Sequence, residues 1–225
     1  MMDAQGFTAR LVKEGAANYH DQHPVHQRMH QGELSKRQLQ RWVENRFYYQ
    51  GRIPIKDALI LSKSEDASFR RMWIHRIHDH DGESAETGGL AQWLNLAEAV
   101  GLDRQETASF TNVLPGVRFA CDGYVDLVRQ SPLVVAVASS LTELFAPDLM
   151  SARIAAWEKH YPWVGQEALA YFRGRVTRAR RDGDEGLDFV LRNANTDPLQ
   201  EACIEALRRK TQVLWHLLDC LQLAG

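Results

Sequence analysis

The spacing of apolar residues constrains the fold of this chain more than any other feature. Apolar residues recur at intervals of three and four along almost the whole sequence, and the alternating pattern of half-buried strands is missing. A chain of 225 residues with this pattern is expected to form one domain over residues 1–225, an all-α compact helical bundle. The predicted helices cover about residues 7–17, 24–31, 35–62 with a kink near Gly51 and Pro54, 66–81, 87–100, 115–130, 132–146, 148–159, 164–180 and 198–223.

Residues 132–146 are predicted to form a central helix, because this segment is apolar on nearly all sides. Its longest unbroken apolar run, LVVAVA at 133–138, is too short to cross a bilayer, and the first residues lack the pattern of a signal peptide. We therefore expect a cytoplasmic protein that does not bind membranes.

Charge and cysteine content exclude further classes. The 27 Lys and Arg residues nearly balance 29 Asp and Glu residues, for a net charge of −2, so nonspecific nucleic-acid binding has no electrostatic support. Cys121, Cys203 and Cys220 are widely separated and form no CxxC motif, which argues against disulfides and thiolate metal sites. A reducing cytosol fits this usage.

Polar residues on core-facing helix stripes predict a binding pocket. The stripe through Leu39 and Trp42 continues to Arg46, Tyr49 and Gln50. Other helices bring further inward polar residues, namely Tyr171, Arg175, Lys210, Thr142 and Glu143. Buried cations need compensation, and a ligand with several carboxylates is a natural partner for arginines. We expect Glu143 to pair with Arg153 and to hold one wall of this pocket.

The stretch WIHRIHDHDGE at 73–83 has the composition of a metal site, but its helical spacing disperses the histidines. Arg76 and His80 are predicted to face inward, whereas His75 and Asp79 point to solvent. We expect the Arg76 cation to lower the pKa of His80 and keep it neutral.

His26 and His30 have the four-residue spacing of a metal-binding pair. No third ligand is evident nearby, so we expect them to lie on a solvated helix surface rather than in a metal site.

Several motifs in order resemble the pyrroloquinoline-quinone synthase (PqqC) family. They cover more than nine-tenths of the chain and are YHDQHPVHQRMHQGELSKRQLQRWVENRFYYQ, RIHDHDGE, VLPGVRFACDGYV, SSLTELFAP, HYPW and AYFRGR. The resemblance implies a haem-oxygenase-like helical fold and a homodimer. It also implies the last step in making the redox cofactor PQQ, without metal or flavin. In that step a reduced tricarboxylate precursor (AHQQ) undergoes ring closure and multi-electron oxidation by O2, with release of H2O2.

The resemblance also implies the site residues. Residues expected to bind substrate are Tyr19, Arg46, Tyr49, Gln50, Arg76, Tyr124, Thr142, Glu143, Arg153 and Lys210. His20 and His80 are expected to move protons, and His80, Tyr171 and Arg175 to surround O2 and peroxide. The sequence departs from the family at Met150, where better-known members carry a histidine, and it ends at Gly225, before the family's usual tail.

Three other functions remain open at this point. A di-iron oxygenase on the same scaffold would need inward carboxylates and histidines, whereas Tyr171 and Arg175 face inward here. A thiaminase-like enzyme would need a nucleophile, for which Cys121 is the candidate. A non-catalytic PQQ-binding paralogue, disabled through Met150, would bind the product without consuming oxygen.

Overall fold

The computed structural model describes residues 1–224 and confirms the all-α prediction, with no β-strand among these residues. The α-helices are α1 (Ala4–Ala17), α2 (Pro24–Gln31), α3 (Lys36–Leu61), α4 (Ala67–Trp73), α5 (His75–Asp81), α6 (Gly88–Ala99), α7 (Arg104–Ala108), α8 (Pro115–Gln130), α9 (Leu133–Ala138), α10 (Ala146–His160), α11 (Ala170–Asn193) and α12 (Asp197–Leu223). Short 3₁₀ helices join them, namely η1 (His20–Gln22), η2 (Leu141–Leu144), η3 (Pro162–Val164) and η4 (Glu167–Leu169).

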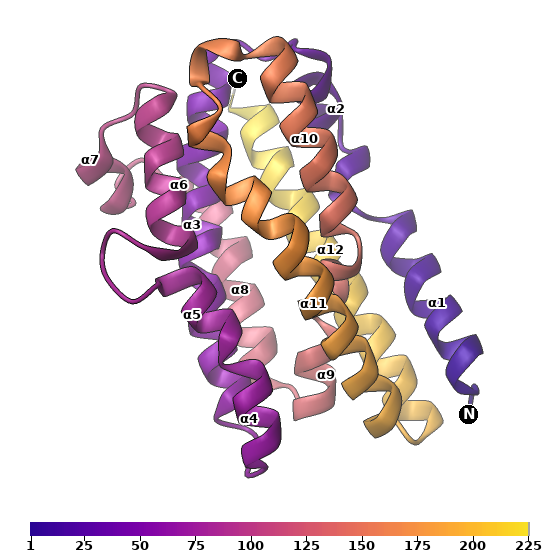
Figure 1. Cartoon of the computed structure of the whole chain (residues 1–225). Helices are drawn as coiled ribbons and strands as arrows, with labels where there is room; N and C mark the ends of the chain where they lie inside the picture. The colour runs from indigo at the N-terminus through magenta and orange to yellow at the C-terminus, as the bar shows by residue number, and fades with distance from the viewer. Residues whose placement is uncertain (225) are drawn as a thin grey trace.

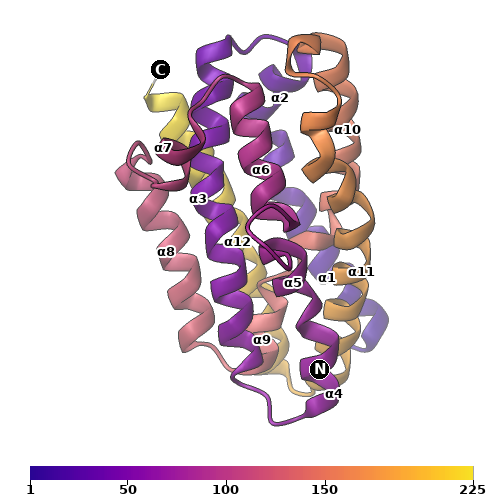
Figure 2. The same cartoon turned by 60° about the vertical axis from the view of Figure 1, so that its left-hand side comes forward.

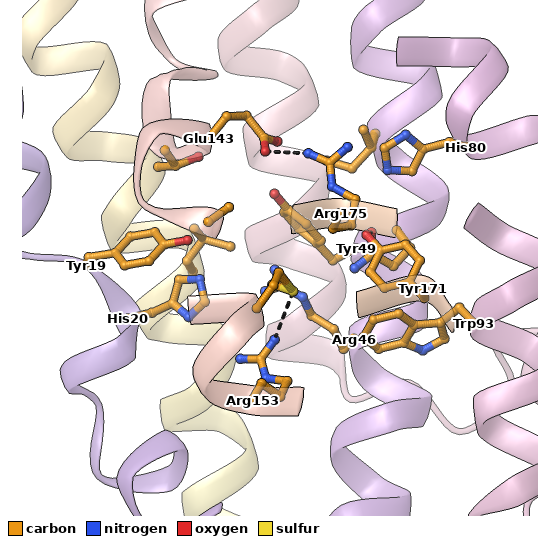
Figure 3. A pocket seen from close by; sticks show the side chains of 16 residues that line it. Tyr19, His20, Arg46, Tyr49, His80, Trp93, Glu143, Arg153, Tyr171 and Arg175 are labelled. Atoms are coloured by element: carbon orange, nitrogen blue, oxygen red, sulfur yellow. Dashed lines mark hydrogen bonds and ion pairs between the residues drawn. The ribbon is translucent and has the colours of Figure 1, made fainter. Parts of the chain in front are cut away.

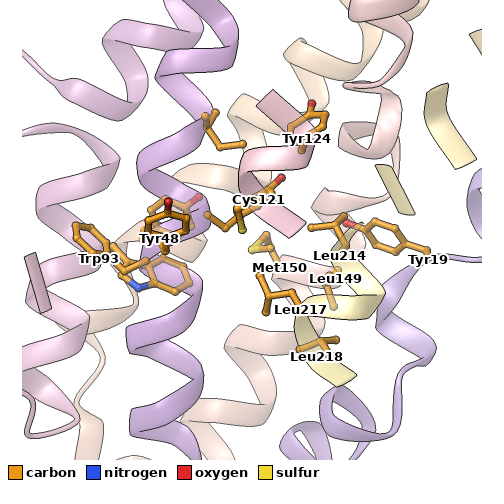
Figure 4. Close-up of a cluster of buried hydrophobic side chains, with 14 of the residues drawn as sticks. Tyr19, Tyr48, Trp93, Cys121, Tyr124, Leu149, Met150, Leu214, Leu217 and Leu218 are labelled. Carbon is orange, nitrogen blue, oxygen red and sulfur yellow. The ribbon is translucent and has the colours of Figure 1, made fainter. Parts of the chain in front are cut away.

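The long helices α3, α8, α11 and α12 run roughly along one axis of the bundle (Figures 1 and 2). Helix α3 packs on α8, α8 on α12, and α10 on α11. The side chains of Trp42, Trp73, Trp93 and Trp157 are fully buried between these elements. Figure 4 shows part of the apolar core, where Leu214, Leu217 and Leu218 of α12 approach Met150 and Leu149 of α10.

The central segment is buried as predicted, but the prediction of one continuous helix was wrong. Helix α9 ends at Ala138, η2 follows, and α10 starts at Ala146. The hydroxyl of Ser139 donates to the Ala136 carbonyl at 2.7 Å, and the Ser140 backbone N–H donates to Val137, three residues back, at 2.9 Å. Serines that bond locally in this way compete with α-helical pairing and tighten the turn.

Three other helix boundaries differ from the sequence prediction. The helix predicted at 66–81 is divided at Ile74 into α4 and α5, and the short α7 was missed. Helix α11 begins at Ala170 and continues to Asn193, well beyond the predicted end at 180. Gly183 lets this extended helix pack closely on η2, because a Cβ there would lie 3.1 Å from the Leu144 side chain.

The stretch Leu133–His160 is long and apolar enough by composition to cross a membrane. However, 72% of its most apolar window is buried in the bundle, as is usual for the core of a soluble helical protein. The apolar composition of this stretch is therefore explained by its place in the core.

Candidate active site

A polar cavity lies in the middle of the bundle (Figure 3). Its empty space is about 510 Å³, a figure that includes the part open to solvent. Eleven of the fourteen predicted site residues line it, and these are Tyr19, His20, Arg46, Tyr49, Gln50, His80, Thr142, Glu143, Arg153, Tyr171 and Arg175. Sequence reasoning missed the lining residues Ile53, Trp93, Ala146 and Leu214.

One side of the cavity carries charges that neutralise one another. Arg175 pairs with Glu143 and, at 3.2 Å, with Asp182 of the same helix. Asp182 also lies 3.9 Å from Arg76 and 2.7 Å from Arg181. Burial alone would raise the pKa of Asp182, but the Arg76 and Arg175 guanidinium groups outweigh it and lower that pKa. We call Arg76, His80, Glu143, Arg175 and Asp182 the paired side.

The structure corrects the expected partner of Glu143, which is Arg175 rather than Arg153. The break before α10 causes this difference, because it places Glu143 in η2, which packs against α11. Arg76 also differs from expectation. Its guanidinium does not line the cavity but lies over the Trp73 ring and donates to the Asp182 carbonyl at 2.5 Å.

The opposite side of the cavity carries cations without carboxylate partners among the residues described. Arg46 stacks on the Tyr49 ring, with 4.0 Å between the guanidinium carbon and the ring centre. Arg153 is 1% exposed and donates to Nε2 of His26 at 3.3 Å, and its Nε has no hydrogen-bond partner within residues 1–224. Burial, and then the charge of Arg46, lower the pKa of Arg153. We call His20, His26, Arg46 and Arg153 the unpaired side.

His80 faces inward, as its helical position predicted. Nδ1 of its ring lies 2.9 Å from the Arg76 carbonyl, so Nδ1 carries the proton of the neutral ring. Burial, and then the Arg175 charge, lower the pKa of His80, so the expectation that Arg76 is the responsible cation was wrong. Asp79 is not left in water either, since it pairs with Arg181 at 2.6 Å and Arg178 at 3.3 Å.

His20 lies on the other side of the cavity from His80 (Figure 3). Nδ1 of His20 is 3.1 Å from Nδ1 of His26, and the His26 nitrogen is also 2.9 Å from the His20 carbonyl. Burial, and then nearby arginines, lower the pKa of both histidines well below the ordinary value. The prediction that His26 lies on a solvated surface was wrong, because it is 1% exposed and packs against Trp42.

Tyrosine hydroxyls link the cavity to the surrounding polar groups. Tyr171 donates to Oε1 of Gln50 at 2.7 Å, and Nζ of Lys210 donates to the Tyr49 hydroxyl at 2.6 Å. Lys210 also lies 3.4 Å from the centre of the Tyr124 ring. Lys210 and Tyr124 thus form a layer behind Tyr49 rather than the cavity wall. Burial, and then the Lys56 charge, lower the pKa of Lys210 well below the ordinary value.

A further buried ion pair lies beyond this layer and was missed by the sequence reasoning. Lys56 pairs with Asp57 at 2.7 Å and donates to the Ser140 hydroxyl at 2.9 Å. Asp57 also accepts from the Trp73 indole at 2.9 Å. Both residues continue the inward stripe of α3, so the spacing rule that found Arg46 and Gln50 would have found them as well.

The cavity does not suit a metal ion or a thiolate nucleophile. Within residues 1–224, no group of three or more His, Cys, Asp or Glu side chains could hold a metal, and three arginines line the cavity. These cations would repel another cation. Cys121 lies outside the lining, and burial raises the pKa of its thiol to about 12, which disfavours the reactive thiolate.

Comparison with known proteins places the chain among close relatives. It is 52% identical to pyrroloquinoline-quinone synthase of Rhizobium meliloti (strain 1021), over 97% of this chain and 86% of that protein. It is 51% identical to the protein of the same name in Rhizobium rhizogenes and 47% identical to that of Pseudomonas aeruginosa (strain LESB58), each over 96% of this chain and over 88% and 86% of those proteins.

Solved structures support the haem-oxygenase-like fold. A domain with a heme oxygenase-like fold from Shewanella denitrificans has a TM-score of 0.80 at 12% identity, covering 100% of this chain and 94% of that one. A TenA homologue from Pseudomonas syringae has a TM-score of 0.79 at 14% identity, covering 98% and 96%. The model of the TENA/THI-4/PQQC family matches residues 9–220. With close relatives along nearly its whole length, the chain belongs to the TENA/THI-4/PQQC family.

Proposed function

We propose that this enzyme catalyses the last step of PQQ biosynthesis, in which AHQQ undergoes ring closure and multi-electron oxidation by O2 to PQQ, with release of H2O2. The relatives named pyrroloquinoline-quinone synthase support this proposal. O2 is the co-substrate, and no metal or organic cofactor takes part.

The observation that carries the proposal is the excess of buried cations around the cavity. Three carboxylates, Asp57, Glu143 and Asp182, face six basic side chains, which are Arg46, Lys56, Arg76, Arg153, Arg175 and Lys210. Arg46, Arg153 and Lys210 have no carboxylate partner within residues 1–224, which suits a substrate with several carboxylates. Arg46 and Arg153 bind carboxylates of the substrate directly, and Lys210 acts on the substrate through the Tyr49 hydroxyl.

The proton and electron chemistry then uses the neutral groups of the cavity. His20 and His80 handle protons during ring closure and oxidation. In each two-electron step, the reduced ring loses two electrons and two protons, and O2 gains them to become H2O2. His80, Tyr171 and Arg175 form the polar corner for O2 and peroxide, where the Arg175 cation stabilises the negative charge that develops on oxygen.

The test mixes chelator-treated protein with the reduced precursor in air and follows quinone absorbance and peroxide. We expect quinone and peroxide to appear together, and neither to appear without O2. Absence of turnover would defeat the proposal, and activity that depends on added iron would favour the di-iron alternative. Activity that survives Cys121→Ala would exclude a thiaminase-type mechanism.

Met150 gives a specific reason to keep a second candidate, a non-catalytic PQQ-binding paralogue. Its Sδ lies 3.9 Å from Nη1 of Arg153 in the cavity wall, where better-known family members carry a histidine. This candidate predicts tight binding of PQQ without oxygen uptake. Turnover that appears only in Met150→His would support it.

The family resemblance and the charge balance suggest the oligomeric state, the localisation and the classes of partner. We propose a cytoplasmic homodimer that binds neither membranes nor nucleic acid. Light scattering coupled to gel filtration would test the dimer. A monomer at micromolar concentration with full activity would contradict it.

A further inference from the structure

The hydrogen bonds around His26 determine which nitrogen of His20 carries a proton. Arg153 can only donate, so Nε2 of His26, at 3.3 Å, must be the acceptor. The proton of the neutral His26 ring is therefore on Nδ1. That N–H lies 2.9 Å from the His20 carbonyl and 3.1 Å from Nδ1 of His20, and both can accept from it.

The opposite arrangement would create two conflicts. If Nδ1 of His20 were the donor, the His26 lone pair would face the His20 carbonyl oxygen at 2.9 Å. The proton on Nε2 of His26 would then face the Arg153 N–H group at 3.3 Å. Neutral His20 therefore keeps its proton on Nε2, the nitrogen for which the described residues supply no hydrogen-bond partner.

His80 is held in the other tautomer. Its Nδ1–H donates to the Arg76 carbonyl at 2.9 Å, so Nε2 carries the lone pair. The two histidines line opposite sides of one cavity (Figure 3). One is thus prepared to donate a hydrogen bond and the other to accept a proton.

We propose that His26, which does not line the cavity, is a positioning residue. Together with Arg153 it fixes His20 as a hydrogen-bond donor to a substrate oxygen. His80 is then the proton acceptor. This inference rests on the proposed function and divides the work between the two histidines. When a ring C–H bond of the substrate breaks, its proton goes to Nε2 of His80. The electron pair stays in the conjugated ring, from which O2 then takes two electrons. O2 becomes H2O2 by taking up the proton held on His80 and a second proton that leaves the oxidised substrate. His20 holds a carboxylate or quinol oxygen during this step.

The direct test is nitrogen NMR on protein labelled with 15N-histidine, at neutral pH and without substrate. Long-range 1H–15N spectra distinguish a protonated ring nitrogen from an unprotonated one, and His20→Gln and His80→Gln identify the signals. We expect protonated Nε2 at His20 and protonated Nδ1 at His26 and His80. A protonated Nδ1 at His20 would overturn the inference, whether or not the protein turns over the precursor.

Kinetics test the positioning role itself. His26→Phe keeps a ring but removes both nitrogens, and we expect kcat to fall about 10–100-fold with PQQ affinity changed little. His26→Asn keeps an N–H donor near the place of Nδ1 and should restore most of kcat.

His30→Phe is the matched control, since His30 stacks on His26 one turn along α2, with 6.2 Å between ring centres. It should leave kcat unchanged. If His26→Phe folds and retains both the kcat and the His20 tautomer of the wild type, the positioning role is refuted while the proposed function stands. If the wild type shows the expected tautomers but no turnover, only the proposed function falls.

Discussion

The paired and unpaired sides of the cavity are similarly buried, but only the paired side neutralises its cations with carboxylates of the protein. On the paired side, Arg175 is held between Glu143 and Asp182, so its charge is balanced within the protein. On the unpaired side, no carboxylate among residues 1–224 reaches Arg46 or Arg153. A buried cation without a partner destabilises a fold, so such groups are retained where a ligand compensates them. The comparison separates charges that are neutralised within the protein from charges that are left available for a ligand.

The largest effect should come from replacing His80, the proposed proton acceptor on the paired side. Asn at position 80 keeps a donor near the place of Nδ1 but has no equivalent of the Nε2 lone pair. We expect His80→Asn to lower kcat by about 10²–10⁴-fold with little loss of PQQ affinity. Steady-state oxygen uptake and PQQ titration would measure the two quantities. His75→Asn, at an exposed position of the same helix, is the control.

The next effect concerns the stability of the paired side. Asp182→Asn removes the carboxylate shared by Arg76, Arg175 and Arg181, and we expect it to lower the unfolding free energy by about 3–5 kcal/mol. Urea denaturation would measure the loss. Asp188→Asn, in an exposed pair on the same helix, should change it by less than about 0.5 kcal/mol. Equal losses in both variants would show that the buried network contributes no more to stability than an exposed ion pair does.

On the unpaired side, removing a buried charge should not lower the stability of the ligand-free protein. Arg46→Met removes an uncompensated buried charge, so we expect the ligand-free protein to be as stable as the wild type or more stable. PQQ affinity should fall about 10–100-fold, which corresponds to the loss of one or two charge-assisted hydrogen bonds. Calorimetric titration and urea denaturation measure both quantities, with the exposed Arg37→Met as control. A clear loss of stability would mean that Arg46 supports the fold as the paired side does.

The last effect, which is small per pH unit, is a pH dependence of the unpaired side. The folded-state pKa values of His20 and His26 are depressed, so the unfolded chain binds more protons once pH falls below about 6.5. Stability therefore falls with falling pH, by up to about 1.4 kcal/mol per pH unit for each histidine. Urea denaturation between pH 7 and 5 should show this slope, and His26→Phe should reduce it. A flat profile would contradict the buried, neutral state of both rings.

Much of the fold and part of the site could be predicted from sequence, because helical spacing determines which residues share a face. The stripe from Leu39 to Gln50 placed Arg46 and Tyr49 correctly in the interior. The family resemblance supplied Tyr19, His20 and Tyr124, which spacing alone did not single out.

Features that depend on packing between helices could not be predicted. The partner of Glu143 depends on the helix break before α10, for which the serines at 139 and 140 gave only a weak signal. The burial of His26 depends on α10 and α3 covering α2, a contact between distant segments. Asp182 lies in the charged stretch ARRDGDEG, which resembles solvated surface until Gly183 is seen packed against η2.

The interruption of the central segment has an electrostatic consequence of its own. Because α9 stops at Ala138, a new helix of 15 residues, α10, starts inside the bundle, and its first residue, Ala146, lines the cavity. The start of an α-helix carries roughly half a positive charge from its aligned peptide dipoles, and no side chain caps this one. The broken helix therefore places the positive end of a backbone dipole at the cavity wall, and this contribution persists whatever side chains occupy the wall.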